Sequence, residues 1–189
     1  MKRRDVLKFG VTAIMSAPLL STVLFGSTSI PKSILQAYSP SFFSGNQLDL
    51  IKAIADTILP KTESPSASEV GVPEKMDSMI SAILREDEKG NYMRRFELFE
   101  NYLGRTLNGE SFIDLDQEQR LAVLNEIDQS SEGNLEPIRQ ALWDIKGRTV
   151  DYYRNSRVIA TTYLNFLPIP GYYEPCATVE ELGGKAWAI

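Results

Sequence analysis

Apolar residues recur at three- and four-residue spacing through most of the chain after residue 45, and this periodicity constrains the fold more than any other feature. Such spacing places apolar side chains along one face of an α-helix. No stretch of the sequence shows the apolar–polar alternation that indicates a half-buried strand. The sequence therefore predicts an all-α fold, a single irregular bundle of five or six helices.

Residues that start or stop helices set the expected boundaries. Pro60 ends the first helix, and Pro73 lies in the first turn of the second. Asn108 and Gly109 end the third helix, and Asp116 opens a capping-box pattern before the fourth. The predicted helices cover 47–59, a segment that starts at 71–73, 91–107 after a charged turn at 86–90, a segment that starts at 116, 135–154 and a short 156–162.

The first 29 residues have the character of a targeting segment, because basic residues precede a mildly apolar stretch at 11–25. Arg3 and Arg4 are followed by an apolar pair that ends at Leu7, and then by Lys8. This run resembles the twin-arginine export motif, which is an address read by a receptor. The resemblance implies that the twin-arginine translocase exports the folded protein to the periplasm.

Two other interpretations of this segment stay open, namely an ordinary secretory signal and an uncleaved membrane anchor. Pro18 and several hydroxyl residues interrupt the apolar stretch, which disfavours a stable spanning helix. Residues 30–45 form the expected leader, an extended tether rich in Ser and Pro, and residues 46–189 form the expected helical domain. An uncleaved signal, or a complex at the membrane, would associate the domain with the bilayer.

Composition excludes several classes of function. Of 20 basic and 25 acidic residues, four basic and one acidic lie in the first 29, which leaves 16 basic and 24 acidic residues, a net charge of −8. This balance disfavours a nucleic-acid binder. The chain has no histidine and one cysteine, so it lacks the usual ligands of zinc and of iron–sulfur clusters and the base of a Ser-His-Asp site. We therefore expect no cofactor site in this chain.

The C-terminal segment after residue 163 is rich in proline and tyrosine, and we expect it to be non-helical. Its Leu and Phe residues can pack on the domain itself, whereas Tyr172 and Tyr173 suit a partner interface equally well, because a tyrosine ring is apolar and its tip is polar. Gly183 and Gly184 predict a flexible tail.

Cys176 is the one cysteine, so no disulfide can form within the chain. We expect its thiol to be buried, because a free cysteine behaves as a small hydrophobic residue. An intermolecular disulfide and a reactive thiol are the alternatives.

Several motifs follow one another along the chain. They are residues 55–60 with Thr62, Ser64, Pro65 and Ala67, residues 71–73, residues 151–153 with Ser156, and residues 168–176. In this order they resemble the motifs of the gluconate 2-dehydrogenase subunit 3 family, the small subunits of exported flavin-dependent sugar and polyol dehydrogenases. Asp151 and Pro175 stand where the family commonly has glycine. The likeness extends over nearly the whole domain.

This resemblance implies a non-catalytic subunit. In the family, a large subunit binds FAD and oxidises the sugar or polyol, and a multihaem cytochrome c often accepts the electrons. The small subunit is thought to help the flavoprotein fold and to carry it through the twin-arginine pathway. We accordingly expect a partner interface on the motif residues Tyr152, Tyr153, Pro168, Pro170, Gly171, Tyr172, Tyr173 and Cys176.

Two alternatives come from other classes of function. One is a free-standing periplasmic binding or scaffold protein. The other is an enzyme that uses a pair of carboxylates, which would be drawn from Asp56, Glu63, Asp114 and Asp116. No spacing among these four acids selects an acid–base pair, and exposed acids are the default for such residues.

Overall fold

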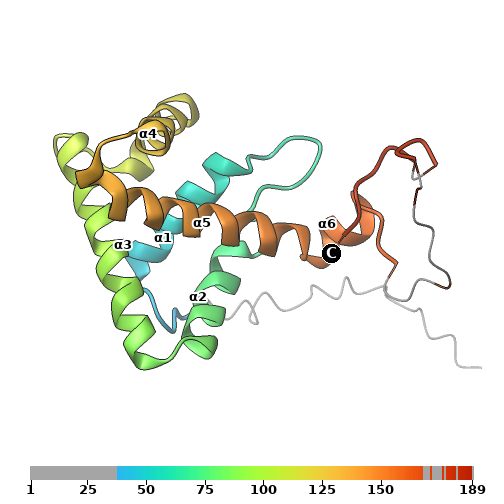
Figure 1. Cartoon of the computed structure of the whole chain (residues 1–189), viewed down its shortest axis with the longest axis horizontal. Helices are drawn as coiled ribbons and strands as arrows, with labels where there is room; N and C mark the ends of the chain where they lie inside the picture. Colours follow the sequence, from blue (N-terminus) through green and yellow to red (C-terminus); the bar gives the residue numbers. More distant parts are fainter. Residues whose placement is uncertain (1–37, 168–170, 172–175, 177, 182, 189) are drawn as a thin grey trace, which may run out of the picture. The chain divides into compact units, whose positions relative to one another are not determined.

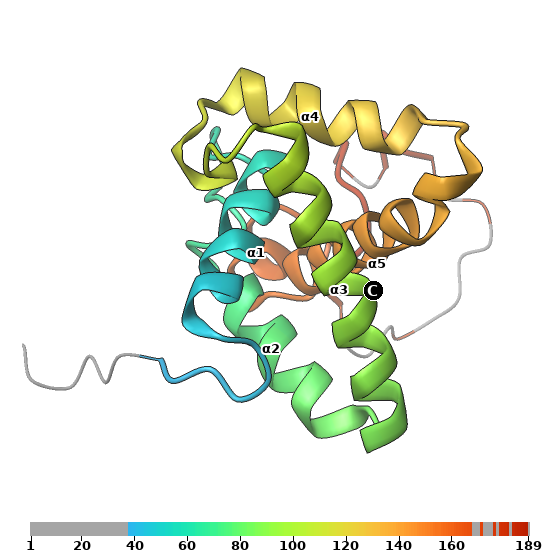
Figure 2. The ribbon, with the colours of Figure 1, turned by 90° about the vertical axis from the view of Figure 1, so that its left-hand side faces the viewer.

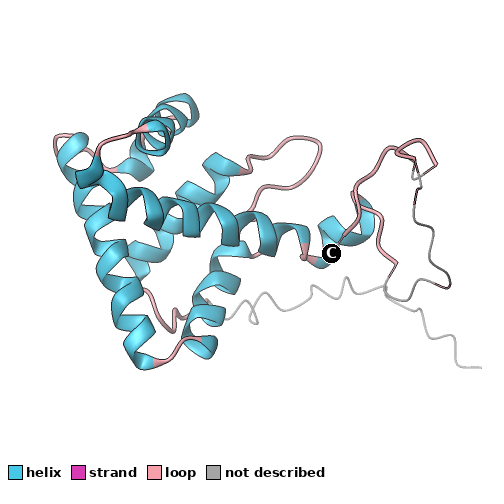
Figure 3. Cartoon of the chain, viewed as in Figure 1, coloured by secondary structure: helices cyan, strands magenta, loops and turns pink. Residues whose placement is uncertain are grey.

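A computed structural model describes residues 38–167, 171, 176, 178–181 and 183–188, and within them the regular elements are helices joined by loops, without a strand (Figures 1 and 3). The all-α prediction is confirmed. The elements are α1 (Gly45–Ile58), α2 (Val72–Ile83), α3 (Glu86–Thr106), the 3₁₀ helix η2 (Phe112–Asp114), α4 (Gln117–Gln129), the 3₁₀ helix η3 (Gly133–Leu135), α5 (Glu136–Arg154) and α6 (Arg157–Thr162).

Helix α5 is the central element, because it contacts each of the other five α-helices of the described chain (Figure 1). Its most extensive contact is with α3, and α4 packs on both α1 and α5 (Figure 2). The buried residues of α5 are Ala141, Leu142, Ile145, Thr149 and Tyr153, which follow the helical repeat. One stripe of this helix therefore serves as the common contact surface of the bundle.

The buried side chains form two hydrophobic clusters. The larger cluster joins α1, α2, α3, α4 and the first half of α5. Aromatic rings fill one side of it, where Phe43 packs on Phe96 with 5.2 Å between the ring centroids, and Phe42 meets Phe43 edge to face at 4.8 Å. The smaller cluster lies where α5 ends, and it is described with the candidate site below.

Several predicted helix ends are confirmed. Pro73 lies in the first turn of α2, and the Asp116 carboxylate accepts a hydrogen bond from the Gln119 amide at 2.8 Å as the cap of α4. Asn108 and Gly109 have φ values of 53° and 89°, the left-handed conformation expected after the end of α3.

Helix α3 begins earlier than the sequence predicted. Residues 86–90, expected to be a charged turn, form its first turn instead. The Arg85 amide donates to the Glu88 carboxylate at 2.9 Å, and the acidic residues Glu86, Asp87 and Glu88 lie at the positive end of the helix dipole. The same charges that suggested a solvent-exposed turn thus stabilise a helix N-terminus.

The end of the chain also differs from the flexible tail that the sequence predicted. Gly183 and Gly184 adopt positive φ values of 67° and 74° in a turn. After the turn, the Asn165 amide donates to the Ala186 carbonyl at 2.8 Å, and the Ala188 amide donates to the Asn165 carbonyl at 2.9 Å. These two hydrogen bonds attach the tail to the segment that follows α6.

Truncation of the buried face of α5 should destabilise the whole unit. We expect Leu142→Ala to lower the free energy of unfolding by about 3 kcal/mol, because it removes a fully buried side chain and leaves a cavity. Chemical denaturation followed by circular dichroism measures this change. The matched control is Leu121→Ala on α4, a leucine that is 45% exposed, and its cost should stay below about 1 kcal/mol. Equal costs would contradict the central role of α5.

Candidate functional site

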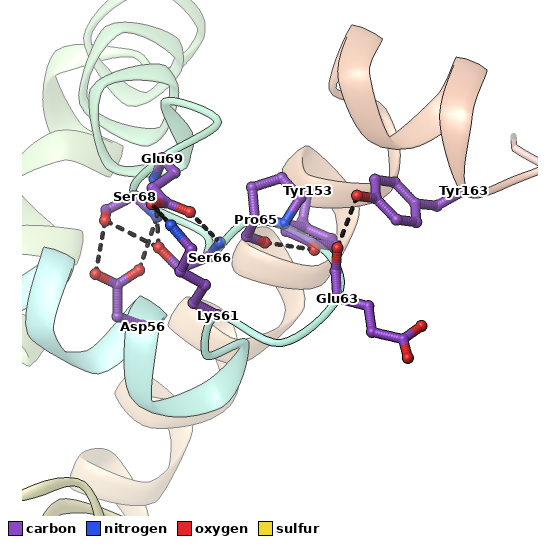
Figure 4. A network of polar contacts seen from close by, with 9 residues as sticks. All are labelled: Asp56, Lys61, Glu63, Pro65, Ser66, Ser68, Glu69, Tyr153 and Tyr163. Atoms are coloured by element: carbon purple, nitrogen blue, oxygen red, sulfur yellow. Dashed lines mark hydrogen bonds and ion pairs between the residues drawn. The ribbon is translucent and has the colours of Figure 1, made fainter.

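The loop between α1 and α2, residues 59–71, is held in a defined shape by its own polar contacts (Figure 4). The Asp56 carboxylate, at the end of α1, accepts hydrogen bonds from the Ser68 amide at 2.8 Å and from the Ser68 hydroxyl at 2.6 Å. The Glu69 carboxylate pairs with the Lys61 amine at 2.6 Å and accepts from the Ser66 amide at 3.0 Å. Both acids thereby satisfy backbone donors that the loop would otherwise leave unpaired.

Two tyrosines from the other end of the sequence bind the far side of this loop (Figure 4). The Tyr153 hydroxyl, from α5, donates to the Pro65 carbonyl at 2.7 Å and lies 3.0 Å from the Ser64 hydroxyl. The Tyr163 hydroxyl, just after α6, donates to the Glu63 carbonyl at 2.8 Å. The loop is therefore fixed between α1 on one side and the α5–α6 region on the other.

The smaller hydrophobic cluster lies beneath these contacts. Its buried members are Ala55, Ala67, Val72, Tyr153 and Ile159, and the half-buried Leu59, Val70, Tyr152, Tyr163 and Leu164 pack against it. The motif segments 55–67, 71–73 and 151–153 are far apart in the sequence, and the structure brings them together in this one cluster. We call the cluster and the loop that it supports the motif platform.

Tyr152 connects the motif platform to the larger core. Its ring is half-buried, and its hydroxyl lies 3.4 Å from a guanidinium nitrogen of Arg148. Arg148 also pairs with Asp144 at 2.8 Å and stacks over the Tyr92 ring at 5.6 Å. Burial lowers the pKa of Arg148, but the hydrogen bond and charge of Asp144 outweigh this effect and leave the pKa raised. The guanidinium therefore stays charged and holds Tyr152 in place.

Asp77 is a structurally important residue that the sequence-based expectations did not include. It is fully buried on α2, and its carboxylate accepts hydrogen bonds from the Tyr38 hydroxyl at 2.6 Å and from the amides of Ser41, Phe42 and Phe43 at 2.6, 2.9 and 2.8 Å. These contacts bind the described part of the expected leader to the domain. A carboxylate within the apolar stripe of α2, three residues before buried Ile80, was the signal that could have identified it.

The charge of Asp77 depends on these donors. Burial alone would raise the pKa of Asp77, but the hydrogen bonds from the Phe43 amide, the Tyr38 hydroxyl and the Ser41 and Phe42 amides outweigh burial and hold the pKa below its ordinary value. A buried carboxylate that accepts four hydrogen bonds is stable in its ionised form.

The predicted interface residues are found in different environments. Tyr153 is only 9% exposed, and its hydroxyl is used inside the chain, so it supports the motif platform rather than presenting a surface. Tyr152 is half-buried, and Gly171 is exposed. Pro168, Pro170, Tyr172 and Tyr173 lie outside the described residues, as do the export-signal residues Arg3, Arg4, Leu7 and Lys8.

The expectation that the thiol of Cys176 is buried was wrong, because this residue is exposed. The expectation rested on the preference of a free thiol for apolar surroundings. Cys176 is exposed, so this preference is not met within the described part of the chain.

The carboxylates considered for an acid–base pair have structural roles or point elsewhere. Asp56 binds Ser68, and Asp116 caps α4. The Glu63 side chain points away from the polar network around it (Figure 4), and Asp114 lies in the first turn of η2. Within the described residues, no group of three or more His, Cys, Asp or Glu side chains could hold a metal ion.

The fold and the motif platform define an all-helical protein in which three separated motifs build one buried cluster and brace one surface loop. A family model described as gluconate 2-dehydrogenase subunit 3 matches residues 45–171, and the chain belongs to this family. Membership implies a small subunit of a dehydrogenase complex. No curated protein and no solved structure matches the chain. Among the described residues, the helices are too short or too polar to cross a membrane.

The hydrogen bond from the Tyr153 hydroxyl should stabilise the 59–71 loop of the motif platform. We expect Tyr153→Phe to lower the free energy of unfolding by about 1 kcal/mol, because the Pro65 carbonyl loses its partner. Limited proteolysis should then cut the 59–71 loop faster than in the wild-type protein. Tyr102→Phe, at a half-buried tyrosine of α3, is the matched control and should leave the loop as resistant as before. An unchanged cleavage rate in Tyr153→Phe would refute this role.

The Asp77 contacts predict a dependence of stability on pH. Because the pKa of Asp77 is lowered in the folded state, its contribution is present above the pKa of the unfolded chain, about 3.9, and is lost as the pH falls through the folded-state pKa. Asp77→Asn should lower the free energy of unfolding by about 2 to 3 kcal/mol at pH 7. The variant should also lose less stability than the wild type between about pH 5 and pH 2. Parallel pH curves for the two proteins would contradict the assignment.

Proposed function

We propose that this protein is the non-catalytic small subunit of a periplasmic flavin-dependent dehydrogenase that oxidises sugars or polyols. The observation that carries the proposal is family membership over residues 45–171, a range that contains the whole motif platform. The large subunit of such a complex would hold FAD and the substrate. A multihaem cytochrome c would be the electron acceptor where the complex has a third subunit.

The chemistry of this chain supports a role in assembly rather than in catalysis. The sequence has no histidine, and its one cysteine is exposed. The acids of the motif platform bind loop amides and hydroxyls, so their lone pairs are used to hold a surface in shape. A rigid, braced loop loses little conformational entropy when it docks, which favours binding to a partner.

The partner surface that we propose joins the motif platform to the C-terminal segment. Tyr152 contributes from α5, and Gly171 and Cys176 contribute from the segment after α6. Phe166 and Leu167, at the start of that segment, are each 52% exposed. Neighbouring exposed apolar side chains of this size are typical of an interaction surface. Pro168, Pro170, Tyr172 and Tyr173 belong to the same proposed surface by their place in the sequence.

The export role that we propose depends on the arginine pair at the N-terminus. The small subunit would supply the twin-arginine signal, and the folded flavoprotein would travel with it through the twin-arginine translocase. The mature complex would then lie in the periplasm, either free or held at the membrane by an uncleaved signal or by another subunit.

The subunit assignment can be tested by affinity purification from the native periplasm and membranes. A tagged chain expressed at its native level should co-purify with a larger protein that has the absorption spectrum of bound flavin. The complex should reduce an artificial electron acceptor when a sugar or polyol is added. Recovery of the tagged chain alone and colourless would overturn the assignment.

A conservative change to the signal tests the carrier role. We expect Arg3→Lys combined with Arg4→Lys to leave both this chain and the flavoprotein in the cytoplasm, because a lysine pair keeps the charge but not the motif. Immunoblots of cytoplasmic and periplasmic fractions measure the distribution. Lys32→Arg, in the expected leader, is the control and should leave export unchanged. Arrival of the flavoprotein in the periplasm with the double variant would disprove the carrier role.

A further inference from the structure

A hollow of about 240 Å³ opens beside Tyr152, where the start of α2 meets the junction between α5 and α6. It lies at the edge of the motif platform, and four of its lining residues belong to the family motifs, namely Gly71, Val72, Tyr152 and Ser156. Gly71 has a φ of 76°, a conformation that favours glycine and allows the chain to turn into α2 at the wall of the hollow. The remaining lining residues are Val70, Lys75, Asn155 and Arg157.

The side chains that line this hollow carry positive charge, whereas the whole chain has a net charge of −5. Lys75 and Arg157 line it, and no aspartate or glutamate does. Three other hollows on the described surface each include at least one carboxylate. Both basic side chains are on exposed residues, and neither has an ion pair or a side-chain hydrogen bond within the described part of the chain. Two cations are therefore available to one ligand at this point.

Ser156 adds a polar group whose partner is missing. Its hydroxyl oxygen is buried and makes no hydrogen bond to the described residues. Ser156 is the residue before α6, a position where a serine hydroxyl commonly accepts a hydrogen bond from the helix, but here it makes no such bond. A buried hydroxyl without a partner costs free energy, and a ligand in the hollow that accepts its proton would remove that cost.

No carboxylate lines the hollow, although one lies close to it. Glu74, next to the lining residue Lys75 in the sequence, lies close to the hollow but is not among its lining residues. Its carboxylate approaches to 4.0 Å the position that a Cβ atom would take at Gly71. The hollow itself thus presents cationic and neutral donors, together with the apolar walls of Val70, Val72 and Tyr152.

We propose that this hollow binds a carboxylate side chain on the surface of the flavoprotein large subunit, an inference that rests on the proposed function. Lys75 and Arg157 would donate charge-assisted hydrogen bonds to the carboxylate, and the Ser156 hydroxyl would donate a third. The methylene groups of an aspartate or glutamate would contact Tyr152 and the two valines. A carboxylate fixed on a partner protein fits better than a free anion, because its translational entropy is lost in the same step as that of the whole partner.

Charge reversal with matched controls tests the proposal. Lys75→Glu and Arg157→Glu should each weaken the affinity for the purified flavoprotein about tenfold or more, measured by biolayer interferometry with the full chain. Both positions lie in first turns, where an acid favours the helix, so a loss of helix stability would not explain weaker binding. Lys52→Glu and Arg94→Glu change the same residue types at exposed positions of α1 and α3 and should bind as the wild type does.

Ser156→Ala separates binding from folding. Because the hydroxyl has no partner among the described residues, its removal should leave the melting temperature unchanged or slightly higher. The affinity for the flavoprotein should nevertheless fall several-fold. A lower melting temperature with unchanged affinity would overturn the role of Ser156 as a ligand.

Zero-length crosslinking identifies the bound group directly. A carbodiimide joins a lysine amine to a carboxylate in contact with it, so mass spectrometry of the treated complex should find Lys75 joined to an aspartate or glutamate of the flavoprotein. Lys75→Arg should abolish this crosslink and retain binding, because it keeps the positive charge but loses the reactive amine. A complex in which Lys75 crosslinks only within its own chain would contradict the proposal.

Failure of this inference is distinguishable from failure of the proposed function. If no flavoprotein co-purifies with the wild-type chain, the subunit assignment fails, and this inference fails with it. If the flavoprotein does co-purify and all four charge reversals bind equally, the subunit assignment stands and the carboxylate site is wrong. Weaker binding in Lys75→Glu and Arg157→Glu alone, together with the Lys75 crosslink, supports both.

Discussion

The packing of one helix stripe is the constraint on which the rest of the structure depends. Helix α5 contacts each of the other five α-helices of the described chain, and its buried residues run from Ala141 to Tyr153 without leaving one face. The first half of this stripe belongs to the larger core, whereas Tyr153 belongs to the smaller cluster. The packing of the larger core therefore also fixes the geometry of the motif platform, because α5 contributes side chains to both.

The buried polar side chains of this protein hold its non-helical segments in shape. Asp56 and Asp77 each sit beneath a non-helical segment and satisfy its backbone amides, and Tyr153 performs the same task for a carbonyl. Each of these contacts spans more than ten residues of sequence and ends in a loop or leader that has no regular hydrogen bonding of its own. The motif residues therefore support a surface of the protein. We propose that this surface recognises a partner.

Sequence periodicity predicted the helices well and the polar supports poorly. The sequence predicted the apolar stripe of α5, the proline at the start of α2 and the cap at Asp116, because each depends on neighbours within one or two helical turns. The sequence could not predict the hydrogen bonds of Asp77 and Tyr153. The partners of Asp77 lie 34 to 39 residues away in the chain, and those of Tyr153 lie 88 to 89 residues away. The acids of residues 86–90 were misleading, because they indicated a turn and instead begin α3.

The position of Asp77 in the chain has a consequence for the order of events during synthesis. The segment that it binds, from Tyr38 to Phe43, leaves the ribosome before α2 does. That segment cannot reach its bound state until α2 has formed and has buried the carboxylate among apolar neighbours. Attachment of the segment from Tyr38 to Phe43 therefore requires that α1 and α2 have already folded together. In the export role that we propose, this contact would attach the segment from Tyr38 to Phe43 only once the domain has folded.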